Sequence, residues 1–402
     1  MKLDSGHLTY CTNIHAGESW GDHFESLDLN FPIIKKEFSP NQAMGIGLRL
    51  SNSASIDLMN SEELNTFKKW LNQQQAYVFT MNGFPFGDFH HTVVKDQVHA
   101  PDWTSQERVD YTLRLFNILA ELLPEGLEGG ISTSPLSYKF WFSTDDLAFQ
   151  AKERATLHII ELAQHLISIK NERDIIMHLD IEPEPDGLLE TGAEFIDWYE
   201  NMLLPLAKLN LTKSLKLSEL EVENCIKTHI CLCYDVCHFA IGYESHAKVI
   251  QQLDEKGIKT GKIQISAALK ADLALDQESK SAIFEAFSKY NEKTYLHQVV
   301  AQKFDQSLIR YRDLPEALEN THNQDVKEWR AHFHVPVFAQ DLGLLQSTQE
   351  DIIEVLKIQK NNAFSAHLEV ETYTWEVLPE SLKVPISESI IRELNWVKEQ
   401  LV

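Results

Sequence analysis

Short apolar runs alternate with longer amphipathic stretches along almost the whole chain. Eight of these runs have the length and pattern of strands, and most of them are rich in Val, Ile, Leu and aromatic residues, a composition typical of buried strands. They lie at 7–15, 44–50, 76–82, 129–134, 175–182, 229–236, 262–266 and 366–372. Strands that alternate with helices predict βα units and a parallel sheet. Eight such units predict an α/β fold of the (β/α)8-barrel, or TIM-barrel, class.

The stretches between these runs have the apolar period of helices, as in 109–119. Two pairs with capping-box spacing predict where helices begin. Thr104 is followed by Glu107, and Ser347 is followed by Glu350. We therefore expect helices that start next to Thr104 and next to Ser347.

Two further strand-like runs, 294–300 and 330–338, lie between the seventh and eighth expected strands. Either they form an inserted hairpin beside the barrel, or one of them is itself a barrel strand. Their spacing fits both arrangements. Since no segment has the composition of an interdomain linker, we expect one domain, 1–402, with an insertion at 270–330 after strand seven. The length agrees, because ~250 residues are typical of such barrels and insertions lengthen them.

Polar and apolar residues alternate within several of the later strands. In a barrel strand, alternate side chains face the lumen and the surrounding helices, so the polar set should converge on the barrel axis. The residues expected to face inward are His178, Asp180, Glu182, Cys231, Cys233, Asp235, Lys262, Gln264, Ser266, His332, His334, His367, Glu369 and Glu371. Burying unpaired carboxylates is costly, and metal binding is a common way to stabilise them. Carboxylates and imidazoles at strand C-termini therefore predict a site for Mn²⁺, Mg²⁺ or Zn²⁺.

The inward residues nearest the mouth are the expected ligands. A lone inward carboxylate is often structural, and we expect His178 and Asp180, which lie deeper in their strand, to form a structural network. Glu182 and Asp235 are expected to bind the metal. Glu371 is preferred over Glu369, because it lies nearer the C-terminal end of its strand.

Three other residues have two interpretations each. Gln264 is a weak ligand type, so its amide either binds the metal or positions another group. His332 and His334 are either functional residues or packed residues at the rim of the inserted hairpin.

Earlier strands and one long loop add polar groups to the same mouth. Loops of this length without regular structure tend to be functional, although a purely structural loop is an equal alternative. The residues expected to contact substrate are His15, Arg49 and Asn82 at strand ends, and His90, His91 and Lys95 in the loop after Asn82.

The overall charge restricts the partners. The formal net charge is -24, whereas proteins that bind nucleic acid or anionic lipid usually present a basic surface. We therefore expect neither a nucleic-acid partner nor membrane insertion. No segment is long and apolar enough to be a transmembrane helix or a secretory signal, and the five cysteines lack a disulfide or zinc-ribbon spacing. Reduced thiols and a cytoplasmic location are the expectation.

The run LDIEPEP followed by YDVCH resembles the xylose isomerase-like (sugar phosphate isomerase/epimerase) barrels. The resemblance implies that Glu182 and Asp235 are metal ligands and that His238 contacts substrate near the metal. A Glu on the last strand, Glu371 or Glu369, would be a further ligand. The family's strand-seven histidine is absent, and its place falls to Gln264 unless His332 or His334 replaces it.

Several longer segments, among them HLTYCTNIHAGESW, HFHVPVF and HLEVETYTWEVLP, are similar to the EboE family of metabolite-traffic proteins. This resemblance implies a role in a bacterial gene cluster that moves secondary-metabolite precursors, with other proteins of that cluster as partners.

Three functions follow as hypotheses. The first is a metal-dependent isomerase or epimerase of a small metabolite, in which Glu182 and Glu371 are ligands and bases and His238 orients the substrate. The metal ligands would be Glu182, Asp235, Gln264, His334 and Glu371, and the substrate-binding residues would be His15, Arg49, Asn82, His90, Lys95, His332 and Glu369. The second is a non-catalytic escort protein that binds the metabolite. The third, a metal-dependent phosphodiesterase or endonuclease, is disfavoured by the acidic charge.

Overall fold

The eight predicted strands form a parallel barrel. The computed structural model describes residues 1–87, 93–378 and 383–402. The barrel strands are β2 (Gly6–Tyr10), β3 (Met44–Arg49), β4 (Ala76–Asn82), β5 (Gly129–Thr133), β6 (Met177–Ile181), β7 (Ile230–Asp235), β8 (Thr260–Ile265) and β15 (His367–Val370). β1 (Lys2–Leu3) pairs antiparallel with β2. The predicted barrel class is confirmed.

The barrel sheet runs in the order β1-β2-β15-β8-β7-β6-β5-β4-β3. Between β2 and β3, a single parallel bridge joins Cys11 to Gly47 in the described chain, and side chains supply further links. Thr9 Oγ1 accepts a hydrogen bond from the Gly47 amide at 3.1 Å, and Thr12 Oγ1 accepts one from the Arg49 amide at 2.8 Å. Threonine hydroxyls thus take the place of backbone carbonyls where the barrel closes.

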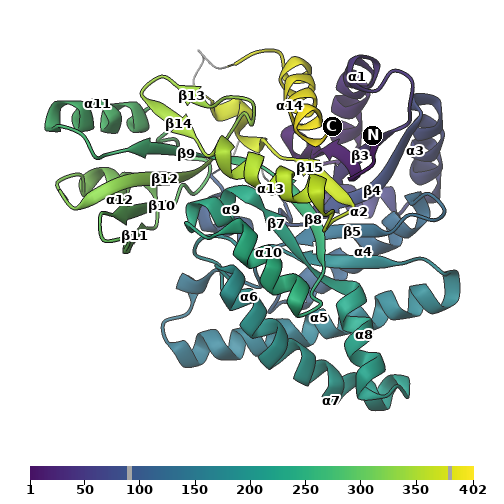
Figure 1. Cartoon of the computed structure of the whole chain (residues 1–402). Helices are drawn as coiled ribbons and strands as arrows, with labels where there is room; N and C mark the ends of the chain where they lie inside the picture. The colour runs from purple at the N-terminus through teal and green to yellow at the C-terminus, as the bar shows by residue number, and fades with distance from the viewer. Residues whose placement is uncertain (88–92, 379–382) are drawn as a thin grey trace.

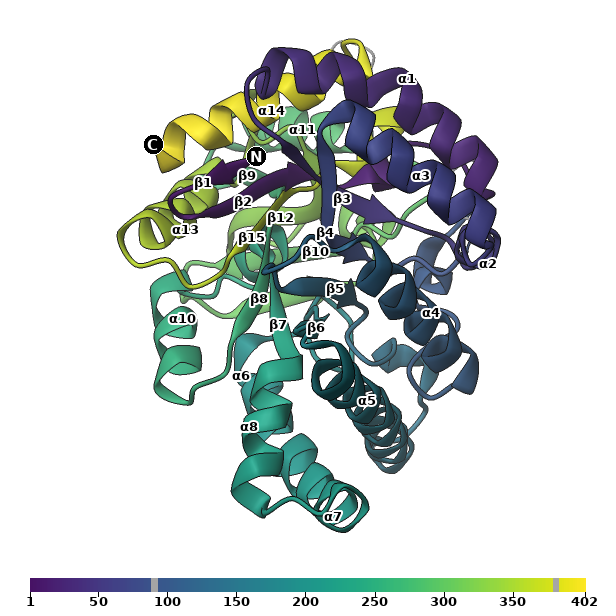
Figure 2. The same ribbon diagram turned by 90° about the vertical axis from the view of Figure 1, so that its right-hand side faces the viewer.

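Helices surround the barrel (Figures 1 and 2). They are α1 (Trp20–Phe38), α2 (Asn52–Leu58), α3 (Ser61–Gln74), α4 (Gln106–Leu122), α5 (Asp145–Arg173), α6 (Gly192–Trp198), α7 (Leu204–Leu215), α8 (Glu219–His229), α9 (Val236–Ile241), α10 (His246–Glu255), α13 (Gln349–Asn361) and α14 (Ile386–Leu401). The outward side chains of β6, such as Leu179, are fully buried beneath them. Burial of this apolar side fixes which side chains face the lumen.

Short helical turns connect several of these elements. They are η1 (Thr12–Ile14), η2 (Lys95–His99), η3 (Lys139–Trp141), η4 (Tyr199–Leu203, a π-helical turn) and η5 (Tyr373–Val377).

Both predicted helix starts are off by one residue. The N-cap of α4 is Ser105, whose hydroxyl accepts from the Glu107 amide, and the N-cap of α13 is Thr348. Thr104 instead hydrogen-bonds to Asp102, which removes it from the cap.

The insertion after the seventh barrel strand is a second sheet, antiparallel throughout. Its strands are β9 (Ala267–Asp272), β10 (Val299–Lys303), β11 (Leu308–Tyr311), β12 (Val326–Val335), β13 (Asp341–Leu342) and β14 (Leu345–Ser347), in the order β11-β10-β12-β9-β14-β13. It carries α11 (Gln277–Ser288) and α12 (Leu314–Glu319) and extends to one side of the barrel (Figure 1). Of the two expected arrangements, an insertion beside the barrel is therefore correct.

Ser266 alone separates barrel strand β8 from β9 of the second sheet. Its hydroxyl donates to Asp235 Oδ1 at 2.6 Å and accepts from the Cys237 amide at 3.1 Å. On β12, the pairing with β9 moves from Ala331 opposite Leu269 to Val335 opposite Ala267, so four steps on β12 match two steps on β9. This bulge contains His332 and His334. β-Bulges often redirect side chains beside functional sites.

The lower part of the barrel lumen is polar and tightly packed. Lys262 Nζ donates to Glu369 Oε1 at 2.9 Å, and neither side chain is exposed. Beneath them, His178 Nδ1 lies 2.6 Å from Asp180 Oδ1. Glycine makes room for these groups, because a Cβ at Gly47 would lie 1.8 Å from Glu369 Oε2.

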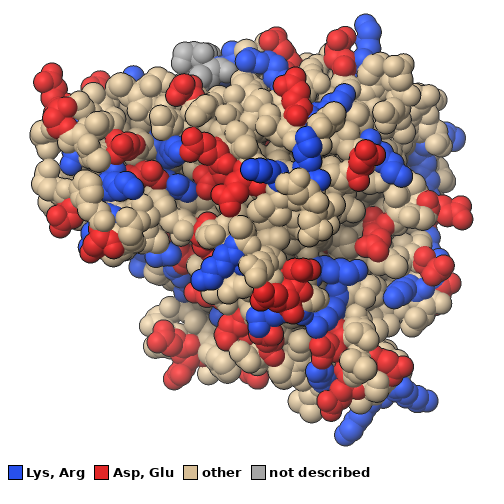
Figure 3. All heavy atoms as spheres, in the orientation of Figure 1, with Lys and Arg blue, Asp and Glu red and all other residues tan. Residues whose placement is uncertain are grey.

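On the face seen in Figure 3, acidic and basic side chains are interspersed rather than separated into fields. Within the described ranges, no helix combines the length and the apolar character that crossing a membrane requires. None of the cysteines forms a disulfide, and four of the five are buried.

Candidate metal centre

Three carboxylates converge where β6, β7 and β15 end. Glu182 follows β6, Asp235 ends β7, and Glu371 follows β15. The strand ladder holds the two glutamates in place, because the Glu182 amide donates to Thr133 O and the Glu371 amide donates to Ile265 O, each at 3.0 Å. One carboxylate oxygen from each acid lies within 4.8 Å of the others, and all three side chains are buried.

The amide of Gln264, on the neighbouring strand β8, lies at the centre of this cluster. Its Nε2 is 3.1 Å from Glu182 Oε1, 3.1 Å from Asp235 Oδ2 and 2.5 Å from Glu371 Oε2. An amide nitrogen has two hydrogens, so it cannot satisfy three carboxylates. In addition, Glu182 Oε2 has no hydrogen-bond partner among the described residues. The cluster is therefore short of positive charge.

The electrostatics of the cluster lead to the same conclusion. Burial, followed by the charge of Asp235, raises the pKa of Glu371 to about 8. The same two causes, in the same order, raise the pKa of Glu182 well above its usual range. Lys262 is the neighbouring cation, but it is already paired with Glu369 one layer below. A divalent ion among the three carboxylates would relieve their repulsion, so the donor set fits such an ion.

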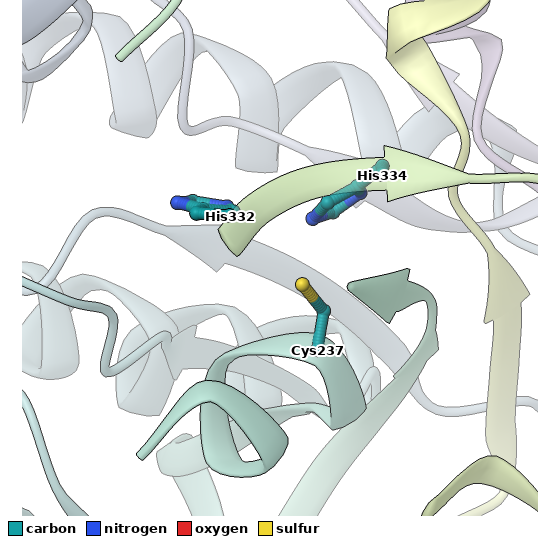
Figure 4. Close-up of side chains that lie close together, drawn as sticks. All are labelled: Cys237, His332 and His334. Carbon is teal, nitrogen blue, oxygen red and sulfur yellow. The ribbon is translucent and has the colours of Figure 1, made fainter. Parts of the chain in front are cut away.

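Imidazoles line the opposite side of the mouth. His238 lies on α9, and its Nδ1 is 3.6 Å from Glu182 Oε1. His334 Nδ1 is 3.6 Å from Glu371 Oε2. His332 and His334 come from the bulge of β12 and approach Cys237 of α9, whose sulfur points toward them (Figure 4). The inserted sheet therefore contributes directly to the mouth of the barrel.

A cavity of about 60 Å³ opens above the carboxylates and between the imidazoles. By the measure in which one water needs ~10–15 Å³, it holds a few waters or the polar end of a small ligand. On its far side, His99 Nε2 lies 3.1 Å from Glu184 Oε1. Burial lowers the pKa of His99 to about 3 and raises the pKa of Glu184 well above its usual range.

Two asparagines hold one oxygen of Glu371. Asn13 Nδ2 donates to Glu371 Oε1 at 2.7 Å, and Asn82 Nδ2 donates to the same oxygen at 2.9 Å. Asn82 was expected at the mouth, but Asn13 was not. The sequence signal for Asn13 was its place in the run 7–15, two residues before His15. The structure places His15 outside the cavity lining, with its Nε2 3.1 Å from Tyr10 Oη.

The remaining predicted residues occupy different places. Glu369 lies one layer below the centre. Arg49 is turned toward Glu18, with Nη2 3.2 Å from Glu18 Oε2, and does not line the cavity. Lys95 does line it and pairs with Asp313 at 2.7 Å. His90 and His91 lie outside the described residues.

Other cavity residues were not predicted individually. Those with polar side chains include Glu184, His99, Gln298, Tyr295 and Tyr373. Glu184 had a detectable signal, because it belongs to the same LDIEPEP run as Glu182.

No protein-family model and no curated protein matches the sequence. Among solved structures, the chain is similar to the IOLI protein with a binding zinc atom, with 11% identity, a TM-score of 0.47 and coverage of 98% of each chain. It is also similar to the probable 3-DHS dehydratase AsbF of Bacillus anthracis, with 12% identity, a TM-score of 0.46 and coverage of 98% of each chain.

A third similar structure is a xylose isomerase-like TIM-barrel protein of Mycobacterium smegmatis in complex with magnesium. It has 10% identity and a TM-score of 0.45, and the match covers 97% of this chain and 92% of that chain. At these values the likenesses assign no function to this chain, and its own residues have to supply the argument.

Proposed function

We propose that this chain is a metal-dependent enzyme of the isomerase or epimerase type that acts on a small polyhydroxylated or carbonyl metabolite. The observation that carries the proposal is the convergence of Glu182, Asp235 and Glu371 on one amide at the carboxyl ends of the strands. Barrel enzymes have their active sites at this end. The small cavity directly above the cluster suits part of a small metabolite.

In this proposal Glu182, Asp235 and Glu371 hold a Mn²⁺, Mg²⁺ or Zn²⁺ ion, together with Gln264 and His334. Such an ion supplies Lewis-acid stabilisation of negative charge on substrate oxygens.

The protein's own groups would carry the proton. For an isomerase, a carboxylate oxygen of Glu182 or Glu371 would accept a proton from one substrate carbon and return it to the adjacent carbon on the same face. For an epimerase, one of these glutamates would accept the proton and the other, in its protonated form, would donate a proton to the opposite face of the same carbon. Asn13 and Asn82 fix the orientation of Glu371 for this transfer, because both donate to its Oε1. His238 is placed to orient substrate oxygens at the cavity wall.

The similarity to the EboE family adds a finer proposal. The metabolite would be a precursor of a secondary metabolite, and proteins of the same gene cluster would be partners. A non-catalytic escort role is the alternative, since Gln264 occupies the strand position where the xylose isomerase-like barrels are expected to have a histidine.

Two measurements test the proposal. The first is the metal content of the purified protein by elemental analysis, compared with Glu182→Gln and Asp235→Asn. Glu244→Gln is the matched control, since it changes a carboxylate that binds the Gly192 amide away from the mouth. We expect near-stoichiometric metal at the carboxylate cluster in the wild type and the control, and loss of that ion in the two site variants.

The second measurement is incorporation of deuterium from D₂O into a panel of sugars and keto acids, followed by NMR. Metal-dependent exchange at a carbon next to a carbonyl supports an isomerase or epimerase. Tight ligand binding without exchange would support the escort role. A wild-type protein that takes up no Mn²⁺, Mg²⁺ or Zn²⁺ would refute the metal centre itself.

A further inference from the structure

Hydrogen bonds fix which nitrogen carries the proton in three neighbouring imidazoles. His238 Nδ1 lies 3.0 Å from Pro183 O, and His334 Nδ1 lies 3.2 Å from Glu371 O. A carbonyl oxygen only accepts, so each Nδ1 must be the donor. In the neutral ring of both histidines, the lone pair is therefore on Nε2.

The third imidazole, His332, is oriented in the same way. Its Nδ1 lies 2.9 Å from Gln298 Oε1. Exchanging the oxygen and nitrogen of the Gln298 amide would lose a hydrogen bond, because its Nε2 donates to the backbone oxygen of Pro185 at 3.0 Å. Nδ1 of His332 is again the donor, and its Nε2 also keeps a lone pair.

These lone pairs face one another without a donor between them. His238 Nε2 and His332 Nε2 are 3.2 Å apart. His334 Nε2 is buried and has no hydrogen-bond partner among the described residues. Two acceptor nitrogens at this distance repel unless a cation lies between or beside them.

A proton is the weaker candidate for that cation. A proton between the Nε2 atoms of His238 and His332 would leave the buried Nε2 of His334 without a partner among the described residues. Neutral imidazoles whose Nδ1–H donates to an oxygen, and whose Nε2 is free, have the arrangement of histidine ligands in metal sites.

We propose that His332, His334 and Cys237 bind a second divalent cation of the imidazole-preferring class, such as Zn²⁺, next to the carboxylate ion, because one ligand atom from each lies within 4.8 Å of the others (Figure 4). Asp235 would join the two sites, since one of its oxygens lies within 4.8 Å of ligand nitrogens of His238 and His334 and it also belongs to the carboxylate cluster. His238, whose Nε2 lies 3.2 Å from His332 Nε2, is the neighbouring candidate for a fourth ligand.

This second site rests on the proposed function through Asp235, and it assigns His334, a ligand of the first ion in that function, to the second ion instead. The two sites should differ in metal preference. Imidazole and thiolate ligands suit Zn²⁺ or Co²⁺, whereas the carboxylate cluster also suits Mg²⁺ and Mn²⁺.

The test is titration of untagged, chelator-treated full-length protein with Co²⁺, read by calorimetry and by visible absorption. The wild type is expected to bind two Co²⁺ ions, one of which gives the intense bands of a low-symmetry site with imidazole and thiolate ligands, and to bind one Mg²⁺ ion. His332→Gln and, separately, His334→Gln should lose this coloured ion and keep the carboxylate-bound ion. Glu182→Gln should lose the carboxylate-bound ion and keep the coloured ion.

His246→Gln is the matched control, because this buried histidine is bound to Tyr234 and Asp351 away from the mouth. It should bind both ions. A metal-free thermal melt of each variant separates misfolding from loss of a ligand. A wild type that binds one Co²⁺, with no change in His332→Gln, would overturn the second site and leave the carboxylate site intact. Loss of both ions from a folded His332→Gln would also overturn it, since the two clusters would then form one site.

Discussion

Replacing Lys262 by methionine should destabilise the protein strongly. Lys262 and Glu369 form an ion pair at 2.9 Å with no solvent exposure, and Lys262 also donates to Met81 O at 3.0 Å. Removing one partner of such a pair leaves a buried charge without compensation, which typically costs about 3–5 kcal/mol of folding free energy. We expect Lys262→Met to lose about that much. Lys208→Met should lose at most about 1 kcal/mol, because its pair with Glu223 is partly exposed.

The loss should be measurable at neutral pH. Burial alone would lower the pKa of Lys262, but the Glu369 carboxylate raises it above its usual value. A raised lysine pKa means that the stabilisation is fully present below about pH 10 and is lost only as the pH rises further. Urea unfolding at pH 7, followed by circular dichroism, is therefore a suitable assay.

A second variant separates charge from packing. In the double variant Lys262→Met with Glu369→Gln, neither charge remains. Its loss of folding free energy should therefore be smaller than the sum of the two single losses by about 2–3 kcal/mol. The reasoning is refuted if Lys262→Met loses less than about 1 kcal/mol. Strict additivity of the two changes would refute it as well.

Three further outcomes follow from the structure. The pKa of Glu371 is raised to about 8 and that of Glu182 is also raised, so the unfolded chain releases these protons at lower pH than the folded chain does. Chelator-treated protein should therefore lose stability against urea as the pH rises from about 4 to about 8. Adding Mn²⁺ or Zn²⁺ should remove this decline, and a decline unaffected by metal would contradict the proposed role of these carboxylates. Asn82→Ala removes a donor to Glu371 Oε1 and should weaken metal affinity by about 10–100-fold in calorimetry, whereas unchanged affinity would show that this donor does not orient the ligand. Gly261→Ala would place a Cβ 1.9 Å from a carboxylate oxygen of the buried Asp180 and should lower the melting temperature. Gly87→Ala should not, since no atom of the described residues lies within 4 Å of the new Cβ.

The barrel was predictable because its strands obey a simple rule over their whole length. Buried parallel strands require apolar residues on the helix side, and the side-chain period of two then places Glu182, Asp235 and Gln264 on the lumen side without any knowledge of the fold. Where a strand ends, the rule ends with it. β2 stops at Tyr10, and the helical turn η1 (Thr12–Ile14) changes the period, so Asn13 rather than His15 reaches the cavity.

The second sheet was only partly predictable. Its strands β9 and β12 pair across a long stretch of chain, and sequence spacing does not determine which strand pairs with which. No sequence pattern predicted the bulge between Ala331 and Val335. The alternation of His332 and His334 with Phe333 did predict that the two histidines lie on one side of the strand. Phe333 packs against Tyr290 on the other side of the strand, at 5.1 Å between ring centroids.

The junction at Ser266 has a mechanical consequence. Hinge motions need a few residues that can change their backbone angles freely. Between β8 and β9 there is one residue, and its hydroxyl is hydrogen-bonded on both sides, to Asp235 and to the Cys237 amide. A swing of the second sheet away from the barrel would also have to break the hydrogen bond from the Ala268 amide to Thr348 Oγ1. The sheet should therefore behave as a fixed wall and not as a lid, so that access to the centre depends on side-chain rotation and on the loops around the mouth.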